Sequence, residues 1–299
     1  MGEMTGMPEP ADAITDELLE IADALLPGHS LDGARVTAGN LHHVVLVPGT
    51  AAVRVSKRPS SAEEMPRRME VLREVAEAGL PFAVPEPLTP VTRFGERAAV
   101  AVSWIDGKAQ PEGQGDPEQI GRLLRAVREV AVTPRLGRLL NAPRDQGWGE
   151  VLADEVVPRL PDRWRSEVHR RLEAAMALKA VPDALVHGDL GGANVHWSRD
   201  GELVGVLDWD QAHLFDPAVD AALMAWHGWD TVKKAVDPDT YRRARIYDAV
   251  FGVGHLVGVL DGRPLVNVEG YVRSIVDWLE KNAWPTGSEV AGEAAAFSS

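Results

Sequence analysis

The sequence contains no cysteine, which excludes disulfide bonds and thiolate metal sites. It also has no apolar run of about 18 residues, so no segment predicts a membrane-spanning helix. Residues 1–19 lack a basic stretch followed by an apolar core, and they do not predict a secretory signal. These absences together lead us to expect a cytoplasmic protein that does not bind a membrane.

Positive charge is scarce relative to negative charge, with 31 Lys and Arg against 45 Asp and Glu and a net charge of −14. This balance disfavours non-specific binding to nucleic acid or to anionic lipid, and it favours a cationic partner. Simple solubility explains the same charge, so both interpretations stay open. The 299 residues are 45% apolar, which is ordinary globular composition and suits two domains or one bilobed domain.

Three oxygen-bearing side chains stand out in the stretch LVHGDLGGANVHWSRDGELVGVLDWD: Asp189, Asn194 and Asp208. The first two are five positions apart in a glycine-rich loop that follows the apolar run 184–186. Asp208 follows a second apolar run, 203–207, which predicts a buried strand. We expect the two runs to form a hairpin that holds two carboxylates and one amide at the same end of a small sheet.

Such a set of side chains suits phosphoryl transfer. Mg²⁺ takes oxygen ligands, often one or two carboxylates together with substrate phosphates. A further carboxylate must orient or accept the proton of the attacking hydroxyl. Asp189 is the expected base, and Asn194 and Asp208 are the expected metal ligands. The alternative is a turn in which Asp and Asn side chains bond only to their own backbone.

The motif HGDLGGAN followed by GVLDWD resembles the aminoglycoside phosphotransferase family, which comprises antibiotic kinases with a protein-kinase-like fold. Macrolide, tuberactinomycin, choline and homoserine kinases share this signature. In protein kinases the corresponding motifs are H-R-D-x4-N and D-F-G, so Gly188 stands here in place of Arg and Trp209 in place of Phe. The resemblance implies an α+β, bilobed fold with a small antiparallel-sheet lobe (1–103) and a larger, mainly helical lobe (104–299). Residues 1–11 and the Gly-, Ala-, Ser- and Glu-rich residues 286–299 are expected to be disordered.

Apolar periodicity and turn residues predict the elements of the N-terminal lobe. We expect a helix that begins at a Thr15 cap and ends at Leu26, and a second helix over about 62–78. The expected strands are 34–37, 43–47, 51–56 and 98–103.

The third of these strands carries Arg54 where kinases have a nucleotide-contacting Lys, and Lys57 at the end of the strand is the second candidate for this role. Macrolide kinases, which this region resembles, also carry Arg there. The helix that follows has Arg68 where the family's partner Glu is usual, with Glu64 and Glu70 as nearby substitutes. The acidic partner of Arg54 is therefore an open question.

The connection between the first two strands corresponds to the phosphate-covering loop of kinases, so Gly39 and His42 are expected nucleotide contacts. A single glycine is a weak signal there, and a plain hairpin turn is the alternative. Residues 103–107 correspond to the hinge between the lobes. By position, the Ser103 carbonyl and the Ile105 amide are expected to bind adenine or guanine, and the choice between ATP and GTP stays open.

In the C-terminal lobe we expect a helix after Asp116 and a mostly irregular segment over 131–148. The resemblance implies that His187 orients the catalytic loop and takes no part in proton transfer. Asp220 matches a family residue that bonds back to that loop. Further helices are expected over 149–158, 162–178, 238–263 and 264–284. Four arginines are expected on a solvated helix face: Arg163, Arg165, Arg170 and Arg171.

Residues 201–240 contain eight Asp or Glu and only two Lys, which would attract a polycationic substrate. Asp210, Trp226 and Asp230 are the expected substrate contacts, with ordinary helix packing as the alternative for the aromatic residue.

We therefore expect a Mg²⁺-dependent kinase, acting as a monomer or weak dimer, that uses ATP or GTP. It would phosphorylate a hydroxyl of an aminoglycoside, macrolide or tuberactinomycin and thereby confer resistance. The alternatives are a metabolic kinase for choline, homoserine or a sugar, and a non-catalytic pseudokinase that binds nucleotide.

Overall fold

The structure is a computed structural model that describes residues 11–39, 41–140, 147–255, 267–282 and 284. Its internal contacts divide the chain into two compact units. The first unit holds the residues up to Lys108 together with Val195–Trp209, and the second holds Ala109–Asn194 and the residues from Asp210 onward. This grouping places 104–108 and 195–209 with the first unit, whereas the boundary proposed from sequence falls at residue 103.

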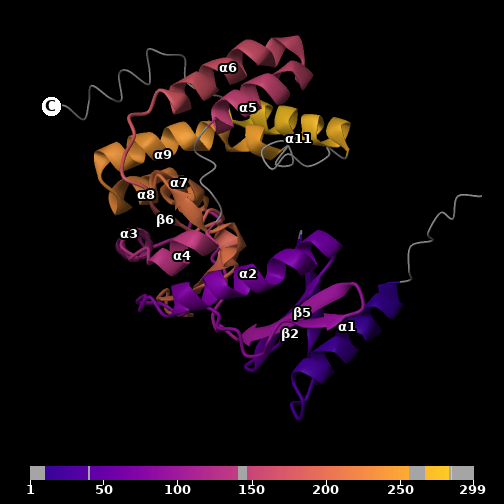
Figure 1. The fold of residues 1–299 in the computed structure, drawn as a ribbon. Coiled ribbons are helices and arrows are strands. Elements are labelled where there is room, and N and C mark those ends of the chain that lie inside the picture. The colour runs from indigo at the N-terminus through magenta and orange to yellow at the C-terminus, as the bar shows by residue number, and fades with distance from the viewer. Residues whose placement is uncertain (1–10, 40, 141–146, 256–266, 283, 285–299) are drawn as a thin grey trace, which may run out of the picture. The chain divides into compact units, whose positions relative to one another are not determined.

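A five-stranded antiparallel sheet forms the centre of the first unit (Figure 1). The expected strands are confirmed, and a short edge strand joins them that the sequence did not suggest. In spatial order the strands are β1 (Arg35–Ala38), β2 (His42–Val47), β3 (Ala51–Ser56), β5 (Arg97–Ser103) and β4 (Thr92–Phe94).

Helix α1 (Ala11–Leu25) covers one face of this sheet, where its buried Leu18 and Ala22 pack against Val53 and Val55. Because side chains alternate between the faces of a strand, Arg54 projects from the opposite face. The expected start of this helix at Thr15 is wrong. The helix already includes residues 11–14, among which two alanines favour helical backbone.

Helix α2 (Pro59–Ala76) contacts β3 and β5 and starts three residues earlier than expected, with a proline in its first turn. Its buried Met65, Met69 and Leu72 recur at helical spacing, so one face of the helix belongs to the core of the first unit.

The hairpin expected from the two apolar runs is wrong in its pairing. Strand β8 (Leu203–Val206) pairs with β7 (Val195–Trp197), and β6 (Ala184–Val186) pairs with β9 (His213–Phe215). The turn over residues 199–201 is too short to reach back past the catalytic loop, so it connects β8 to the nearer strand. That nearer strand has only three residues, which is why its apolar alternation was not recognised.

The second unit is mainly helical within the described residues. Helix α3 (Pro117–Arg128) is capped as expected, since the Asp116 carboxylate accepts a hydrogen bond from the Gln119 N–H at 2.9 Å. A short helix, α4 (Pro134–Leu139), lies in the segment that was expected to be mostly irregular. Parts of the two expected C-terminal helices fall on 256–266 and 283, outside the described residues. The other α-helices described in this unit are α5 (Trp148–Glu155), α6 (Asp162–Met176), α7 (Ala218–Leu223), α8 (Trp229–Ala235), α9 (Pro238–Phe251) and α11 (Val268–Lys281).

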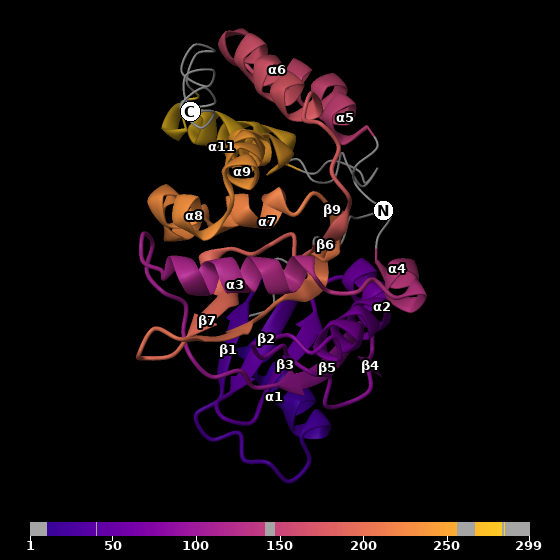
Figure 2. The same cartoon turned by 90° about the vertical axis from the view of Figure 1, so that its left-hand side faces the viewer.

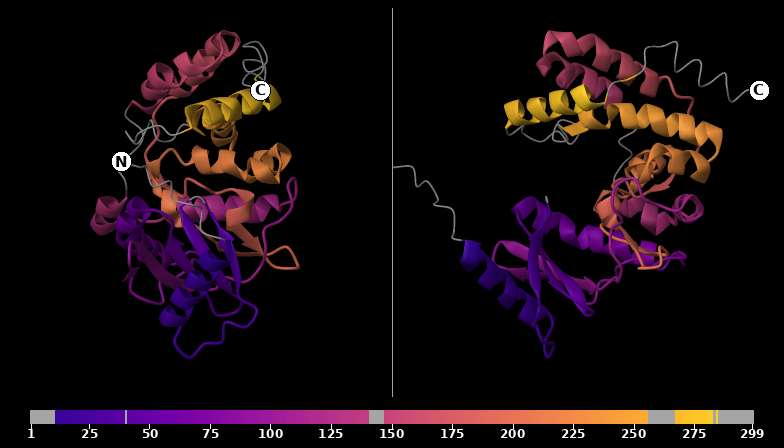
Figure 3. Two further views of the ribbon diagram at one scale, coloured as in Figure 1. Left: turned by 90° about the vertical axis from the view of Figure 1, so that its right-hand side faces the viewer. Right: turned by 180° about the vertical axis from the view of Figure 1, so that it is seen from behind.

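Helices α5, α6, α9 and α11 gather around one apolar core of the second unit (Figures 2 and 3). Arg171 of α6 is 1% exposed within this region, so its expected place on a solvated face is wrong. Its guanidinium donates to Glu167 at 2.9 Å and to the carbonyls of Ala249 and Asn282 at 3.2 and 2.7 Å. It thereby links the interior of α6 to the C-terminal ends of α9 (Pro238–Phe251) and α11 (Val268–Lys281).

Among the described residues, no helix combines the length and the apolar character needed to cross a bilayer.

Candidate active site

The loop that carries Asp189 lies in the second unit, between β6 and a short 3-10 turn (Gly192–Asn194). The Asn194 amide nitrogen donates to the Asp189 carbonyl at 2.8 Å and to its carboxylate at 3.2 Å. The Asp189 side chain is exposed. The loop is therefore closed by its own two functional residues, and one carboxylate faces solvent.

A buried support lies beneath this loop. His187 is fully buried, and its Nδ1 accepts the Asp189 N–H at 3.2 Å. Asp220 of α7 accepts the N–H groups of His187 at 2.7 Å and Gly188 at 3.0 Å, so the expected bond from Asp220 back to the loop is confirmed. Gly188 has φ +76°, and a Cβ there would lie 2.6 Å from the Gln211 carbonyl, so glycine is required.

Burial raises the pKa of Asp220 from 3.8 to about 6, and the nearby charge of Asp189 adds to this, while the two N–H donors oppose it. Between about pH 4 and pH 6 the native state holds a proton that the unfolded chain has released. The stability contributed by this carboxyl therefore decreases as pH rises through that window. Above it, the carboxylate is charged and anchors both backbone amides.

Asp208 lies in the first unit, two residues after β8, with φ +56°. Its Oδ1 accepts a hydrogen bond from Arg54 at 3.3 Å, and the same guanidinium nitrogen contacts His42 Nδ1 at 3.0 Å. The Arg54 side chain is 11% exposed and that of Asp208 is 48% exposed. Asp208 is thus an acidic partner of Arg54, which the sequence left open because the two residues are 154 positions apart.

The acidic residues of α2 that were considered as partners contact arginines of their own helix. Glu64 pairs with Arg67 at 2.7 Å, and Glu70 pairs with Arg73. These pairs are three residues apart, a spacing at which side chains on a helix meet.

The turn before β2 is tied to the end of β3. The Gly39 N–H donates to the His42 carbonyl at 2.9 Å, and the Lys57 ammonium donates to the Gly39 carbonyl. The His42 side chain is buried beside Arg54. Residue 40, in the middle of the expected phosphate loop, lies outside the described residues.

At the expected hinge, β5 ends at Ser103 and Ile105 is 8% exposed. Gly205 of β8 lies close to Ile105, since a Cβ at Gly205 would be 2.6 Å from the Ile105 side chain and 2.7 Å from the Ala83 carbonyl. The strand that leads to Asp208 therefore packs against the side chain of Ile105 and the backbone of Ala83, and only glycine permits this approach.

Three expected substrate contacts belong to the second unit. The Trp226 indole is 42% exposed and donates to the Gln110 carbonyl at 3.1 Å. A Cβ at Gly192 would lie 2.1 Å from this indole, so the ring rests on the loop between Asp189 and Asn194. Asp210 is half-buried in the 3-10 turn after Asp208, and Asp230 is exposed in the first turn of α8.

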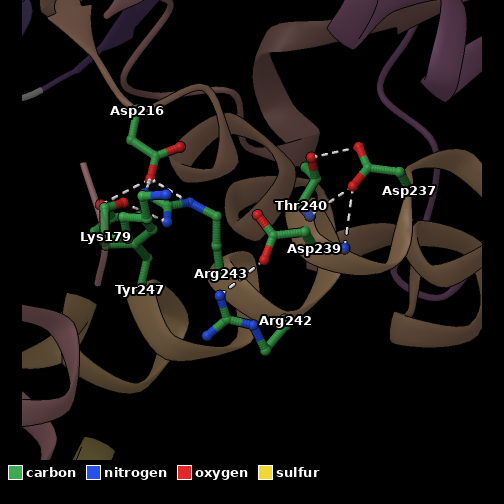
Figure 4. A network of polar contacts seen from close by, with 8 residues as sticks. All are labelled: Lys179, Asp216, Asp237, Asp239, Thr240, Arg242, Arg243 and Tyr247. Atoms are coloured by element: carbon green, nitrogen blue, oxygen red, sulfur yellow. Dashed lines mark hydrogen bonds and ion pairs between the residues drawn. The ribbon is translucent and has the colours of Figure 1, made fainter. Parts of the chain in front are cut away.

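Sequence reasoning missed a buried polar network in the second unit (Figure 4). The Asp216 carboxylate accepts bonds from Arg243 Nε at 2.8 Å, the Tyr247 hydroxyl at 2.9 Å and the Ala218 N–H at 2.9 Å. Burial, together with Asp216, raises the pKa of Tyr247. The available signal was the four-residue spacing of Arg243 and Tyr247, which puts both on one face of α9.

The donor groups fit a magnesium–nucleotide ligand. The Asn194 amide nitrogen donates to Asp189, so the side-chain carbonyl oxygen of Asn194 points away from that bond and can act as a metal ligand. Asp208 provides a half-exposed carboxylate as the second oxygen ligand. Among the described residues, no group of three or more His, Asp or Glu side chains could hold a metal on its own. Two protein oxygens with phosphates are what Mg²⁺ commonly takes. Because Asp189 and Asn194 belong to one unit and Asp208 to the other, their convergence on one ion stays a prediction.

Comparison of the sequence with models of known protein families identifies the family of this chain. The phosphotransferase enzyme family matches residues 32–252, and the chain belongs to this family. The expected assignment to the antibiotic phosphotransferases, with their kinase-like α+β fold, is confirmed. The chain is a phosphotransferase.

The chain is similar to several phosphotransferases that are known to act on antibiotics. The chain is 32% identical to the viomycin phosphotransferase of Streptomyces vinaceus over 226 residues, which cover 70% of this chain and 78% of the relative. A solved aminoglycoside phosphotransferase in complex with GDP and kanamycin has a TM-score of 0.73 at 18% identity, covering 89% and 97% of the two chains. A type I macrolide 2'-phosphotransferase has a TM-score of 0.66 at 21% identity, covering 91% and 99%.

Proposed function

We propose that this protein is an ATP- or GTP-dependent O-phosphotransferase that inactivates a small antibiotic by phosphorylating one of its hydroxyls. The observation that carries the proposal is the 32% identity with viomycin phosphotransferase, together with a catalytic loop closed by Asp189 and Asn194. The neighbours with nucleotide and antibiotic bound support the same chemistry. A cytoplasmic enzyme that acts as a monomer or weak dimer completes the proposal.

In this proposal Asp189 is the catalytic base. Its carboxylate is exposed at a fixed position, because the Asn194 amide and the buried His187 hold the loop from two sides. It accepts or orients the proton of the substrate hydroxyl as that oxygen attacks the terminal phosphate. Asn194 and Asp208 would hold Mg²⁺, which supplies neutralisation of phosphate charge when it is bound with the nucleotide.

The first unit supplies the proposed nucleotide contacts. The Ser103 carbonyl and Ile105 amide would bind the edge of the purine, while Gly39 and His42 belong to the loop over the phosphates. Arg54 would contact a phosphate while Asp208 and the His42 ring hold its guanidinium. Backbone groups of this kind can recognise either adenine or guanine, so the proposal covers both nucleotides.

The charge of the chain favours a cationic substrate. The net charge of −14 attracts cations, and Asp210 and Asp230 would lie along the substrate's path. The exposed indole of Trp226, fixed against the catalytic loop, offers an aromatic face to a cationic group, an interaction worth about 0.5–2 kcal/mol. Aminoglycosides and tuberactinomycins carry several such groups.

A substrate panel tests the proposed function. We expect release of ADP or GDP from the purified protein with Mg²⁺ when viomycin or kanamycin is added, and loss of that release with EDTA. Expression in a sensitive bacterium should raise resistance to the same compound. Turnover of only choline, homoserine or a sugar would establish the metabolic alternative, and a protein that binds nucleotide but turns over nothing would be the pseudokinase.

Asp208→Asn isolates the charge of the proposed metal ligand, because Asn also tolerates the positive φ of this position. We expect the affinity for magnesium–nucleotide to fall at least about 10-fold, comparable to or larger than the effect of losing a supporting residue around a metal. The measurement is calorimetric titration with and without Mg²⁺. Asp200→Asn, an exposed change in the turn of the same hairpin, is the matched control and should bind normally. Equal affinities for the two variants would remove Asp208 from the metal site.

A further inference from the structure

The end of β5 is paired with the extended segment that precedes β4. Pro87 lies opposite Val102, the Leu88 N–H donates to the Ala101 carbonyl at 2.8 Å, and the Ser103 N–H donates to the Glu86 carbonyl at 2.8 Å. These bonds form an antiparallel ladder that runs up to the point where the hinge begins.

A side-chain hydroxyl replaces a backbone acceptor at two places in this ladder, and the one at the hinge is the hydroxyl of Ser103. In a hydrogen-bonded antiparallel pair, the two residues exchange both N–H···O=C bonds. Ser103 donates to Glu86 as the pattern requires, but the Glu86 N–H donates to the Ser103 hydroxyl at 2.9 Å. The side-chain oxygen thus takes the acceptor role that belongs to the Ser103 carbonyl in a regular pair.

We propose that the Ser103 hydroxyl is a positioning group for nucleotide recognition: it accepts the Glu86 N–H so that the Ser103 carbonyl can accept an N–H from the purine edge. This inference rests on the proposed function, because it assigns a role beside the hinge carbonyl. The ligand chemistry is a ring-edge N–H donor, which both adenine and guanine possess.

Removing the Ser103 hydroxyl allows the Glu86 N–H to bond to the Ser103 carbonyl, as in a regular antiparallel pair. In Ser103→Ala the Glu86 N–H has the Ser103 carbonyl as its remaining ladder acceptor and competes there with the purine. A carbonyl has two lone pairs, so the competition weakens the purine bond without abolishing it. The expected loss of nucleotide affinity is about 3- to 10-fold, the range of one ordinary hydrogen bond. Ser103→Thr keeps the hydroxyl and suits the end of a strand, so it should rescue binding.

A second hydroxyl on the same ladder provides a matched control. Thr89 Oγ1 accepts the Ala101 N–H at 3.0 Å, two residues before Ser103. Thr89→Val removes a side chain-to-β5 bond of the same kind and leaves the hinge residue intact. If Ser103→Ala acted only by loosening the sheet, both variants would weaken nucleotide binding alike.

The experiment measures dissociation constants of magnesium-bound ATP, GTP and inorganic tripolyphosphate for wild type and the three variants, with KM and kcat from steady-state turnover. For whichever nucleotide binds tighter, we expect Ser103→Ala to raise the dissociation constant and KM 3- to 10-fold with kcat nearly unchanged. Tripolyphosphate, which lacks a base, should bind all four proteins equally. Ser103→Thr and Thr89→Val should bind nucleotide like wild type.

Normal nucleotide binding by Ser103→Ala would overturn the inference, as would equal weakening in Thr89→Val or a parallel loss of tripolyphosphate affinity. If wild type itself bound neither nucleotide, the proposed function would fail, and this inference with it.

Discussion

Asp189→Asn is expected to lower kcat by about 10²–10⁴-fold, the usual contribution of a positioned general base, while nucleotide affinity is retained. Asparagine keeps the size of the side chain, and its amide oxygen can still accept the bond from Asn194. The backbone carbonyl of residue 189, which accepts the stronger bond from Asn194, is unchanged. The loop therefore keeps its shape and loses its proton acceptor.

The measurement is steady-state turnover of the best substrate, together with calorimetric titration of nucleotide. Asp183→Asn is the matched control, because it removes an exposed carboxylate before β6 without touching the loop. Near-normal kcat for Asp189→Asn would refute the role of Asp189 as the base. Loss of nucleotide binding would show that the substitution had disturbed more than proton transfer.

Arg243→Met is expected to lower the free energy of unfolding by about 3–5 kcal/mol, because it leaves a buried carboxylate without its cation. The side chains of Arg243 and Asp216 are only 5% and 7% exposed. The Tyr247 hydroxyl and the Ala218 N–H remain as donors to Asp216, but neither carries a positive charge. Methionine keeps much of the volume, so the change tests charge more than packing.

Urea-induced unfolding measures this effect, and the neighbouring arginine provides the control (Figure 4). Arg242 pairs with Asp239, with side chains that are 40% and 60% exposed. Arg242→Met should therefore change stability by less than about 1 kcal/mol, as exposed pairs do. Similar losses for the two variants would show that burial of the Asp216 pair is not what stabilises this region.

Asp216 also links stability to the catalytic loop. The Asp216 carboxylate accepts a hydrogen bond from the N–H of Ala218, the first residue of α7. Asp220 of the same helix accepts hydrogen bonds from the backbone N–H groups of His187 and Gly188. Arg243→Met is therefore expected to reduce turnover in the fraction that remains folded.

Local chemistry made the catalytic loop predictable from sequence. Asp189, Gly188 and Asn194 lie within seven positions, and the bonds that shape the loop join near neighbours or follow from the required glycine. The strands of the first unit were predictable for the same reason, since apolar alternation and turn residues are local signals. The motif also identified the family, because the spacing of its acids reflects the chemistry directly.

Contacts between distant residues were not predictable in this way. The pairing of Arg54 with Asp208 spans 154 positions, and that of Asp216 with Arg243 spans 27. Arg171 was placed on a solvated face because charge suggests exposure. Its buried guanidinium instead donates hydrogen bonds to Glu167 and to backbone carbonyls at two helix ends. Local patterns do not reveal which helix end will offer such acceptors.

The β7–β8 hairpin has a consequence for the order of synthesis. Trp197 exchanges both backbone bonds with Lys108 at 2.9 Å, and Ala83 bonds to Val204 and Val206 at 2.9 Å. The ribosome releases these partners some ninety or more residues apart, with the loop of Asp189 emerging between them. The first unit therefore cannot form these backbone hydrogen bonds until residue 206 has emerged from the ribosome. A chain that stalls before that point exposes the unpaired backbone groups of Ala83 and Lys108, to which the β7–β8 hairpin would otherwise bond.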